Sequence, residues 1–243
     1  MKISIITLFP KMISGFFEES IVKRAIKKKL VEIEIINLRD FAIDDYGTVD
    51  DRPYGGGAGM ILRVDVIYKA INKITNDELR IEDKNPKSVI RNRKIRIILT
   101  SPKGKILDQK KAQEYSQLNH LIIIAGHYEG VDERVLDFVD EEVSLGDFIM
   151  TGGEITASAI ADAVVRLIPR VLKKEEATLK ETFSIKGENL LEYPQYTRPE
   201  EFIGKKVPEI LLKGDHKKIE KWRMKKALEE TRKKRPDLLD PNK

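Results

Sequence analysis

Residues 121–154 read LIIIAGHYEGVDERVLDFVDEEVSLGDFIMTGGE, and within this stretch two glycine-bearing turns follow two short apolar runs. The run 121–125 is continuously apolar and is followed by Gly126, which predicts a strand buried on both faces of a sheet. A weaker run, 142–145, is followed by Gly146 and predicts a second strand. Glycine directly after a strand lets the backbone approach a ligand closely and adopt positive φ.

A third turn of this kind, Thr100 to Gly104, follows the apolar run 95–99. Because the carboxyl ends of parallel strands lie at one edge of an open α/β sheet, we expect the three turns to form a ligand site there. Ordinary connections between strands and helices would give the same pattern at any one of these turns, so the prediction depends on all three together.

Strands and helices alternate along the first 172 residues, which predicts an α/β fold with a parallel sheet covered by helices. We expect strands at 2–8, 31–38, 95–99, 121–125 and 142–145. We expect helices at 10–29, 64–74, from 108 onward, 131–138 and 153–166. Residues 39–62 are expected to form a long loop, and residues 76–94 a polar excursion.

The chain divides by composition into three parts. Residues 1–172 form the first domain, and residues 173–188 are rich in charge and poor in large apolar side chains, as is typical of a linker. Residues 189–243 form a small, mainly helical domain with a basic helix from about 215 to 235. The expected inward positions of this helix are Ile219, Trp222, Ala227 and Leu228.

Composition excludes several kinds of chemistry. The 243 residues include no cysteine and three histidines, which excludes disulfides and a cysteine nucleophile and argues against a zinc site, so no metal ligands are predicted. No apolar run approaches the roughly 18 residues needed to span a bilayer. The N-terminus, MKISIITLFP, has no cleavage pattern of a secretion signal. These features favour a cytoplasmic protein with no membrane partner.

The loop 50–60, DDRPYGGGAGM, is the richest in glycine. Four glycines in five residues are entropically costly, so we expect a mobile substrate loop, with a structural turn as the alternative. Asp51, Arg52 and Tyr54 give the loop charge and a stacking face suited to a nucleotide.

Motifs of P-loop enzymes, of dinucleotide-binding folds and of serine hydrolases are missing from the sequence.

The net charge of +5 is unevenly distributed. The segment 205–235 holds 13 Lys or Arg and 5 Asp or Glu, or 13 − 5 = +8, which leaves 5 − 8 = −3 for the rest of the chain. A basic segment on a nearly neutral body is typical of a nucleic-acid partner. The alternative is a solvated helix face in a lysine-rich protein.

Six segments, in this order, closely resemble the bacterial tRNA (guanine-N1)-methyltransferases: 50–60, 100–105, 125–135, 141–154, 193–202 and 207–239. The resemblance covers nearly the whole chain. It implies methyl transfer from S-adenosylmethionine to N1 of the guanosine at tRNA position 37, beside the anticodon. It also implies a deep trefoil knot of the SPOUT type in the first domain, a homodimer with a shared active site, and a dependence on magnesium.

The resemblance implies residue roles by position. His127 stands where relatives often carry Arg, and we assign it no catalytic task. The cofactor-binding residues implied are Leu99, Thr100, Ser101, Pro102, Gly126, Tyr128, Glu129, Gly130, Leu145, Gly146, Asp147, Phe148, Ile149, Met150, Gly152 and Gly153. The substrate-binding residues are expected to be Asp51, Arg52, Tyr54, Gly59, Arg198, Lys217 and Lys221.

The chemistry requires one group that removes the N1 proton of guanine and one cation that stabilises charge on O6. In the resembling family an Arg and an Asp have these roles, and their positions correspond to Arg166 and Glu181 here. Glutamate retains the carboxylate but adds a methylene to its reach. Two other classes stay open: a knotted methyltransferase of ribosomal RNA, and an RNA-binding protein inactivated by the change at Glu181.

Overall fold

The computed structural model describes residues 1–79, 94–173, 178, 181–185 and 188–240. Contacts between residues divide the chain into two compact units, Met1–Leu172 and Lys173–Lys243. Most of the expected polar excursion at 76–94 lies outside the described residues. No helix among those described is long and apolar enough to cross a membrane.

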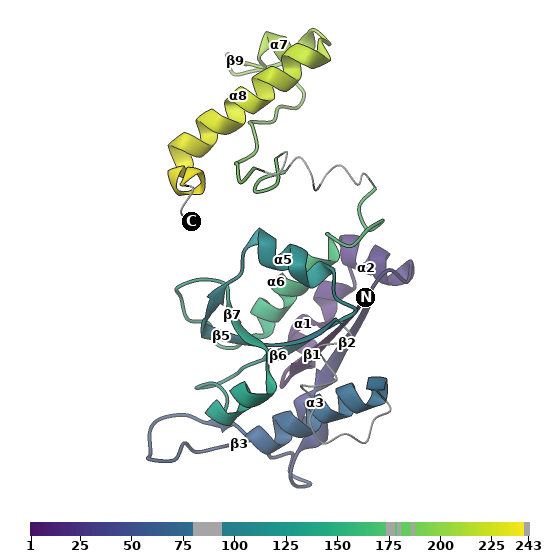
Figure 1. Ribbon diagram of the computed structural model, residues 1–243, viewed down its shortest axis with the longest axis vertical. Helices are drawn as coiled ribbons and strands as arrows, with labels where there is room; N and C mark the ends of the chain where they lie inside the picture. The colour runs from purple at the N-terminus through teal and green to yellow at the C-terminus, as the bar shows by residue number, and fades with distance from the viewer. Residues whose placement is uncertain (80–93, 174–177, 179–180, 186–187, 241–243) are drawn as a thin grey trace. The chain divides into compact units, whose positions relative to one another are not determined.

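The first unit is built on one parallel sheet, as predicted (Figure 1). The strand order is β2-β1-β6-β5-β7. Every residue of β6 is buried, which explains why its sequence is almost entirely apolar. The strands are β1 Lys2–Thr7, β2 Glu32–Asn37, β5 Ile95–Ile106, β6 His120–Ala125 and β7 Glu141–Ser144.

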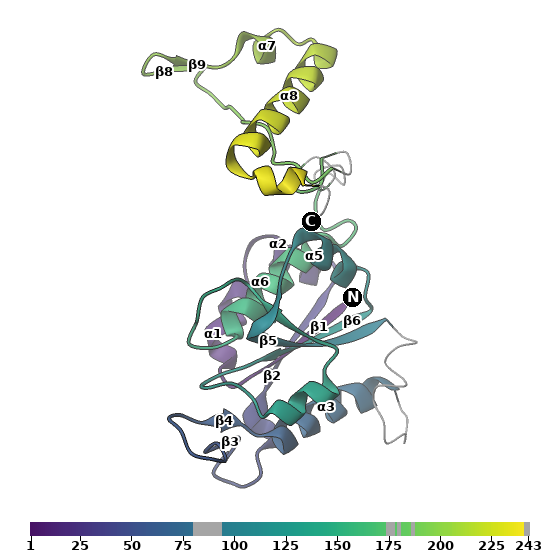
Figure 2. The same ribbon diagram turned by 60° about the vertical axis from the view of Figure 1, so that its left-hand side comes forward.

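Helices cover both faces of the sheet (Figure 2). One core contains Ile3, Ile5, Leu121 and Ile123, and the other contains alternate strand residues such as Ile122. The first face is covered by α1 Pro10–Phe17, α2 Ser20–Lys27, α5 Gln109–Ser116 and α6 Glu154–Val165. The second face is covered by η1 Leu38–Phe41, α3 Val64–Leu79 and η3 Glu133–Phe138.

Some predicted boundaries are wrong. The predicted helix 10–29 is two helices, because Glu19 has extended backbone (φ −129°, ψ 166°) that interrupts it. The predicted loop 39–62 contains η1 and an antiparallel pair, β3 Asp50–Asp51 and β4 Ile61–Leu62. Helix α3 continues to Leu79, and the predicted helix 131–138 is the shorter 3-10 helix η3.

Strand β5 is also longer than predicted. It pairs with β7 on both sides of a register shift between Thr100 and Lys105, so the predicted turn is an irregularity inside the strand. At Gly104 a Cβ would collide with the backbone of Glu142 and Val143, and only glycine permits this approach of the two strands.

The second unit consists of α8 and the segments packed on it. Its core contains Ile185, Leu190 and Ala227. In α8, Ile219 and Ala227 are buried as predicted, whereas Trp222 and Leu228 are half-buried. Because Ile185 belongs to this core, the end of the expected linker packs as part of the second unit. The elements are β8 Glu201–Phe202, β9 Lys205–Lys206, α7 Glu209–Leu212, α8 His216–Lys234 and η5 Pro236–Leu239.

Candidate functional site

A cavity of about 280 Å³ lies at the carboxyl ends of β5, β6 and β7. The three predicted turns meet at one edge of the sheet, as expected, although residues 100–104 lie within β5 and do not follow it. The cavity is lined by all but one of the predicted cofactor-binding residues, the exception being Asp147. Those that line it are Leu99, Thr100, Ser101, Pro102, Gly126, Tyr128, Glu129, Gly130, Leu145, Gly146, Phe148, Ile149, Met150, Gly152 and Gly153.

The three loops are joined by direct hydrogen bonds. The Gly153 amide donates to the Gly126 carbonyl at 2.6 Å, and the Gly126 amide donates to the Thr100 hydroxyl oxygen at 3.2 Å. A Cβ at position 153 would collide with the Thr100 hydroxyl and lie 2.9 Å from the Gly126 nitrogen. Glycine at 153 is therefore what allows the start of α6 to touch Thr100 of β5 and the loop that follows β6.

At other positions of the cavity wall, a close contact or a positive φ favours glycine. A Cβ at Gly126 would lie 3.2 Å from the Thr100 carbonyl oxygen, and Gly130 has a φ of +121°. Tyr128 adopts a φ of +57°, a conformation that costs a side-chain-bearing residue about 1–3 kcal/mol. Tyr128 lines the cavity in this conformation.

The buried side chain of Glu154 stabilises the segments that form the cavity wall. Glu154 is 0% exposed; it accepts a hydrogen bond from the Thr7 hydroxyl at 2.9 Å, and its other oxygen lies 3.3 Å from Nδ1 of His127. The His127 ring also packs on Phe9, with centroids 4.5 Å apart. Because a buried charge needs hydrogen-bonding partners, this network ties the end of β1, the loop after β6 and the start of α6 together.

Sequence reasoning missed Glu154 and Thr7. An acidic residue directly after Gly152-Gly153 at the start of an apolar helix was the available signal, since carboxylates favour helix N-termini. The cavity is also lined by residues outside the predicted cofactor-binding set: Lys103, His127, Val131, Glu133, Leu136, Glu142, Val143, Ser144 and Thr156.

The charge of the cavity favours a cationic ligand over a phosphorylated one. Its lining includes Glu129, Glu133 and Glu142 but a single lysine, Lys103, whose Nζ lies 3.6 Å from a Glu133 oxygen. A polyphosphate would face an excess of carboxylates there. The remaining polar groups are mostly backbone amides and carbonyls, which can recognise the edge of a nucleobase.

The glycine loop, residues 53–60, lies between β3 and β4 and extends away from the sheet (Figure 2). Its Tyr54 is fully exposed. At the base of the loop, Arg63 lies 3.4 Å from an Asp51 oxygen and donates to Asp65 at 2.9 Å. The hydrogen bond from Arg63 lowers the pKa of the Asp65 carboxyl. Of the substrate-binding residues predicted here, Asp51, Arg52, Tyr54 and Gly59 lie outside the cavity lining.

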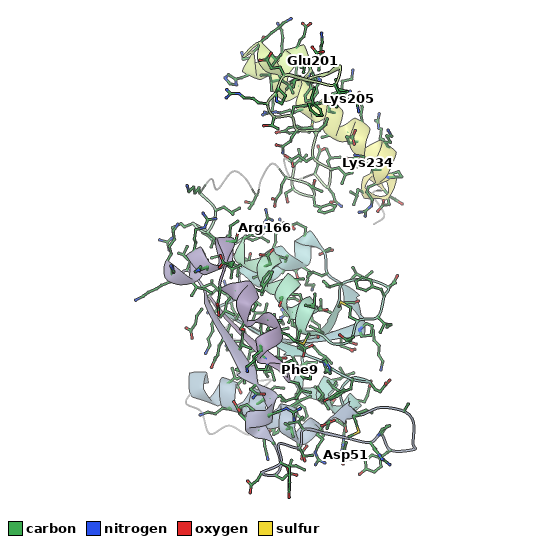
Figure 3. All side chains as sticks on the ribbon, turned by 180° about the vertical axis from the view of Figure 1, so that it is seen from behind. Phe9, Asp51, Arg166, Glu201, Lys205 and Lys234 are labelled. Carbon is green, nitrogen blue, oxygen red and sulfur yellow. The ribbon has the colours of Figure 1, made fainter. Side chains whose placement is uncertain are left out.

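The two predicted catalytic residues belong to different units. Arg166 is half-buried at the C-terminal end of α6, where its charge complements the helix dipole. Figure 3 shows Arg166 and Asp51 at opposite ends of the first unit. Glu181 belongs to the second unit, in a turn closed by a hydrogen bond from the Ser184 amide to the Glu181 carbonyl at 3.0 Å.

Hydrogen bonds connect the turn of Glu181 to α8. The Glu192 amide donates to the Thr182 hydroxyl at 3.1 Å, and the Phe183 amide donates to the Leu190 carbonyl at 2.8 Å. The Leu191 amide in turn donates to the buried hydroxyl of Thr231, in α8, at 2.9 Å. The candidate base is thus attached to the basic helix.

Helix α8 separates a buried face from a basic one. Ile219, Ala227 and Thr231 are buried, whereas Lys217 and Lys221, one helical turn apart, are exposed. Arg198, the remaining predicted substrate-binding residue, is also exposed.

Within the described part of the chain, no group of three or more His, Cys, Asp or Glu is arranged to hold a metal ion.

Comparison with known proteins identifies the family. The family model "tRNA (Guanine-1)-methyltransferase TrmD" matches residues 1–241. The chain belongs to the TrmD family. Proteins named tRNA (guanine-N(1)-)-methyltransferase are similar to it throughout. The protein of Dictyoglomus turgidum is 48% identical over 240 residues, which cover 99% of this chain and 90% of that protein. A Clostridium botulinum protein is 50% identical over 238 residues, with coverage of 98% and 92%.

TrmD family membership implies S-adenosylmethionine as the methyl donor, and the contact at Gly153 allows a test. Gly153→Ala forces the Thr100 hydroxyl and the Gly126 amide aside; overpacking of this kind costs roughly 1–3 kcal/mol, so we expect affinity to fall about tenfold. Isothermal titration calorimetry with S-adenosylmethionine measures this. The control is Gly15→Ala, because no atom lies within 4 Å of the added Cβ. Unchanged affinity in a folded Gly153→Ala protein would contradict the assignment.

Proposed function

We propose that this chain transfers a methyl group from S-adenosylmethionine to N1 of the guanosine at position 37 of tRNA, in the cytoplasm. The observation that carries the proposal is the coincidence of a family match over residues 1–241 with a net-acidic cavity built from glycine-rich loops. A ribosomal RNA methyltransferase would share the cavity but not the segment 193–202 and the basic helix, both of which this chain has.

The cavity suits S-adenosylmethionine in both charge and shape. Bound there, this cofactor supplies an electrophilic methyl group on a sulfonium ion. The carboxylates of Glu129, Glu133 and Glu142 provide the negative potential that a sulfonium favours. Gly126 and Gly153 leave backbone amides and carbonyls close to the ligand. No residue cluster among those described fits Mg²⁺, so the proposed magnesium dependence enters no step here.

We further propose that the three cavity loops form a deep trefoil knot. Supporting it, the chain passes from η3, on one face of the sheet, through β7 to α6 on the other face. The loop that makes this passage pairs with the loop after β6, through a bridge between His127 and Gly152. Its end also contacts the irregular part of β5 at Thr100.

The proposed active site is shared between two subunits. Gly153, at one end of α6, lines the cavity, and Arg166 lies at the other end. The 12 residues of α6 span about 18 Å at about 1.5 Å per residue, so Arg166 cannot reach its own cavity. A second copy can supply it. Exposed apolar side chains on α1, α6 and the cavity loop offer a surface for such a dimer: Met12, Phe16, Phe148, Ile149 and Ile155.

In the proposed mechanism, Glu181 accepts the proton from N1 of guanine, and the Arg166 guanidinium stabilises negative charge on O6. No covalent intermediate is needed, which agrees with a chain without cysteine. Because the turn of Glu181 is hydrogen-bonded to the segment held by α8, the base and the helix that binds tRNA belong to one unit. Proton removal is thereby restricted to bound substrate.

The direct test is methyl transfer from labelled S-adenosylmethionine to tRNA transcripts that differ only at position 37. We expect label to enter the guanosine transcript and not the adenosine transcript, because adenine presents a lone pair at N1 to the Glu181 carboxylate and an amino group, in place of O6, to the Arg166 guanidinium. Label in ribosomal RNA but not in tRNA would favour the other class of methyltransferase. Cofactor and tRNA binding without label transfer would indicate the inactive RNA-binding protein.

Removing the proposed base provides a second test. Glu181→Gln should lower the single-turnover rate by about 10²–10⁴, the usual contribution of a general base. Glu181→Asp should remain active, because it keeps a carboxylate. The matched control is Glu188→Gln, which neutralises a nearby exposed carboxylate in the same segment. A near-normal rate in Glu181→Gln would show that another group accepts the proton.

Mixed dimers test the shared site. A dimer of one Arg166→Ala subunit and one Glu181→Gln subunit should recover about half of the wild-type activity if each site takes one of these residues from each chain, because one of its two sites is then intact. Differently tagged subunits allow this heterodimer to be purified before the assay. A heterodimer as inactive as both parents would contradict the shared site.

The basic helix is tested by salt dependence. Lys217→Gln together with Lys221→Gln should weaken tRNA binding and reduce the log–log slope against salt by about 0.7–0.9 for each lost phosphate contact. The control is Lys27→Gln with Lys28→Gln, which removes the same charge from exposed positions of the first unit. Equal slopes in the two double variants would indicate that the charge of α8 is only a solvated surface.

A further inference from the structure

The glycine loop meets the cavity wall where Gly59 packs against Glu129. A Cβ at position 59 would collide with the Glu129 side chain, lying 2.7 Å from its Oε1 and 2.9 Å from its Cδ. The contact includes Cγ as well, so movement of the carboxylate alone would not relieve it. Glu129 therefore occupies space that exists only because residue 59 is glycine.

Backbone hydrogen bonds hold the two segments together beside this contact. The Glu129 amide donates to the Met60 carbonyl at 3.1 Å, and the Leu62 amide donates to the Gly130 carbonyl at 3.0 Å. Leu62 also forms a parallel bridge with Val131. The end of the glycine loop is thus joined to the wall of the cavity and shifts with it.

The rest of the glycine loop has few contacts. A Cβ at Gly55 or Gly56 would have no atom within 4 Å, and the Tyr54 side chain is fully exposed. The loop is therefore restrained at its two ends, by the contact of Asp51 with Arg63 and by the contact of Gly59 with Glu129. A displacement of Glu129 is transmitted to the loop at Gly59.

We propose that Glu129 is a positioning residue. Through its contact with Gly59, it couples the conformation of the glycine loop to occupancy of the cavity. The inference rests on the proposed function, in which the cavity holds S-adenosylmethionine, and on the expectation that the glycine loop binds the substrate. A cofactor that fixes the Glu129 side chain also fixes the end of the loop. Because such coupling is reciprocal, a change at Gly59 alters cofactor binding although Gly59 does not line the cavity.

Two alanine substitutions separate the contact from backbone strain. Gly59 and Gly56 both have a φ of +83°, so alanine is equally strained at each, but only position 59 faces Glu129. By calorimetry, Gly59→Ala should weaken S-adenosylmethionine binding roughly fivefold or more. Gly56→Ala should leave affinity within about twofold, as for an independent site. Equal affinities in the two variants would overturn the coupling.

A double-mutant cycle tests whether the effect passes through Glu129. Glu129→Ala removes the side chain that a Cβ at position 59 would displace, so adding Gly59→Ala to Glu129→Ala should change affinity no further. If the two effects instead multiply, Gly59 acts independently of Glu129 and the proposal is wrong. Thermal denaturation of each variant separates a loss of binding from a loss of folding.

Hydrogen exchange tests the same coupling without a change at Gly59. Adding S-adenosylmethionine should slow amide exchange in residues 53–60 of the wild-type protein, and this protection should disappear in Glu129→Ala at saturating cofactor. Protection that persists in Glu129→Ala would overturn the proposal. Failure of the wild-type protein to bind S-adenosylmethionine at all would instead refute the proposed function, so the two failures are distinguishable.

Discussion

The candidate site depends on the close approach of Gly153, Gly126 and Thr100. A hydrogen bond of 2.6 Å joins the two glycines, and no room remains for a Cβ at position 153. Thr100 lies in β5 and the two glycines follow β6 and β7, so one contact sets the relative positions of three segments. The buried carboxylate of Glu154 strengthens this arrangement, because it extends the connection to Thr7 at the end of β1. The cavity is thus defined by backbone packing, with few side chains acting alone.

The charges of the two units fit different parts of one reaction. The cavity carries an excess of carboxylates, which would repel a polyphosphate but attract a sulfonium ion. The exposed face of α8 carries lysines, which suit the phosphates of RNA. In the proposed function, cofactor and tRNA are therefore bound by opposite charges on separate units, and neither ligand competes for the site of the other.

The sequence predicted the features that depend on local pattern. Apolar runs followed by glycine identified β6, β7 and the first part of β5, together with the edge of the sheet where the cavity lies. It did not predict the continuation of β5 to Ile106, because Ser101 to Lys105 lacks an apolar pattern and pairs with β7 only through the tertiary fit at Gly104. Glu154 was missed for a similar reason: its partners Thr7 and His127 are distant in the chain.

In the proposed mechanism, Glu181 is the residue whose chemistry and position matter most for catalysis. Glutamate extends its carboxylate one carbon–carbon bond beyond that of the aspartate implied by family resemblance, and this extra reach would loosen a base on an unrestrained segment. Here the turn of Glu181 is hydrogen-bonded to the segment 190–192, which Thr231 attaches to α8. Restraint of the backbone compensates for the longer side chain, because fewer conformations of the segment remain to be lost when the base meets its substrate. In that mechanism, the same connection makes tRNA binding at α8 part of how the base is positioned.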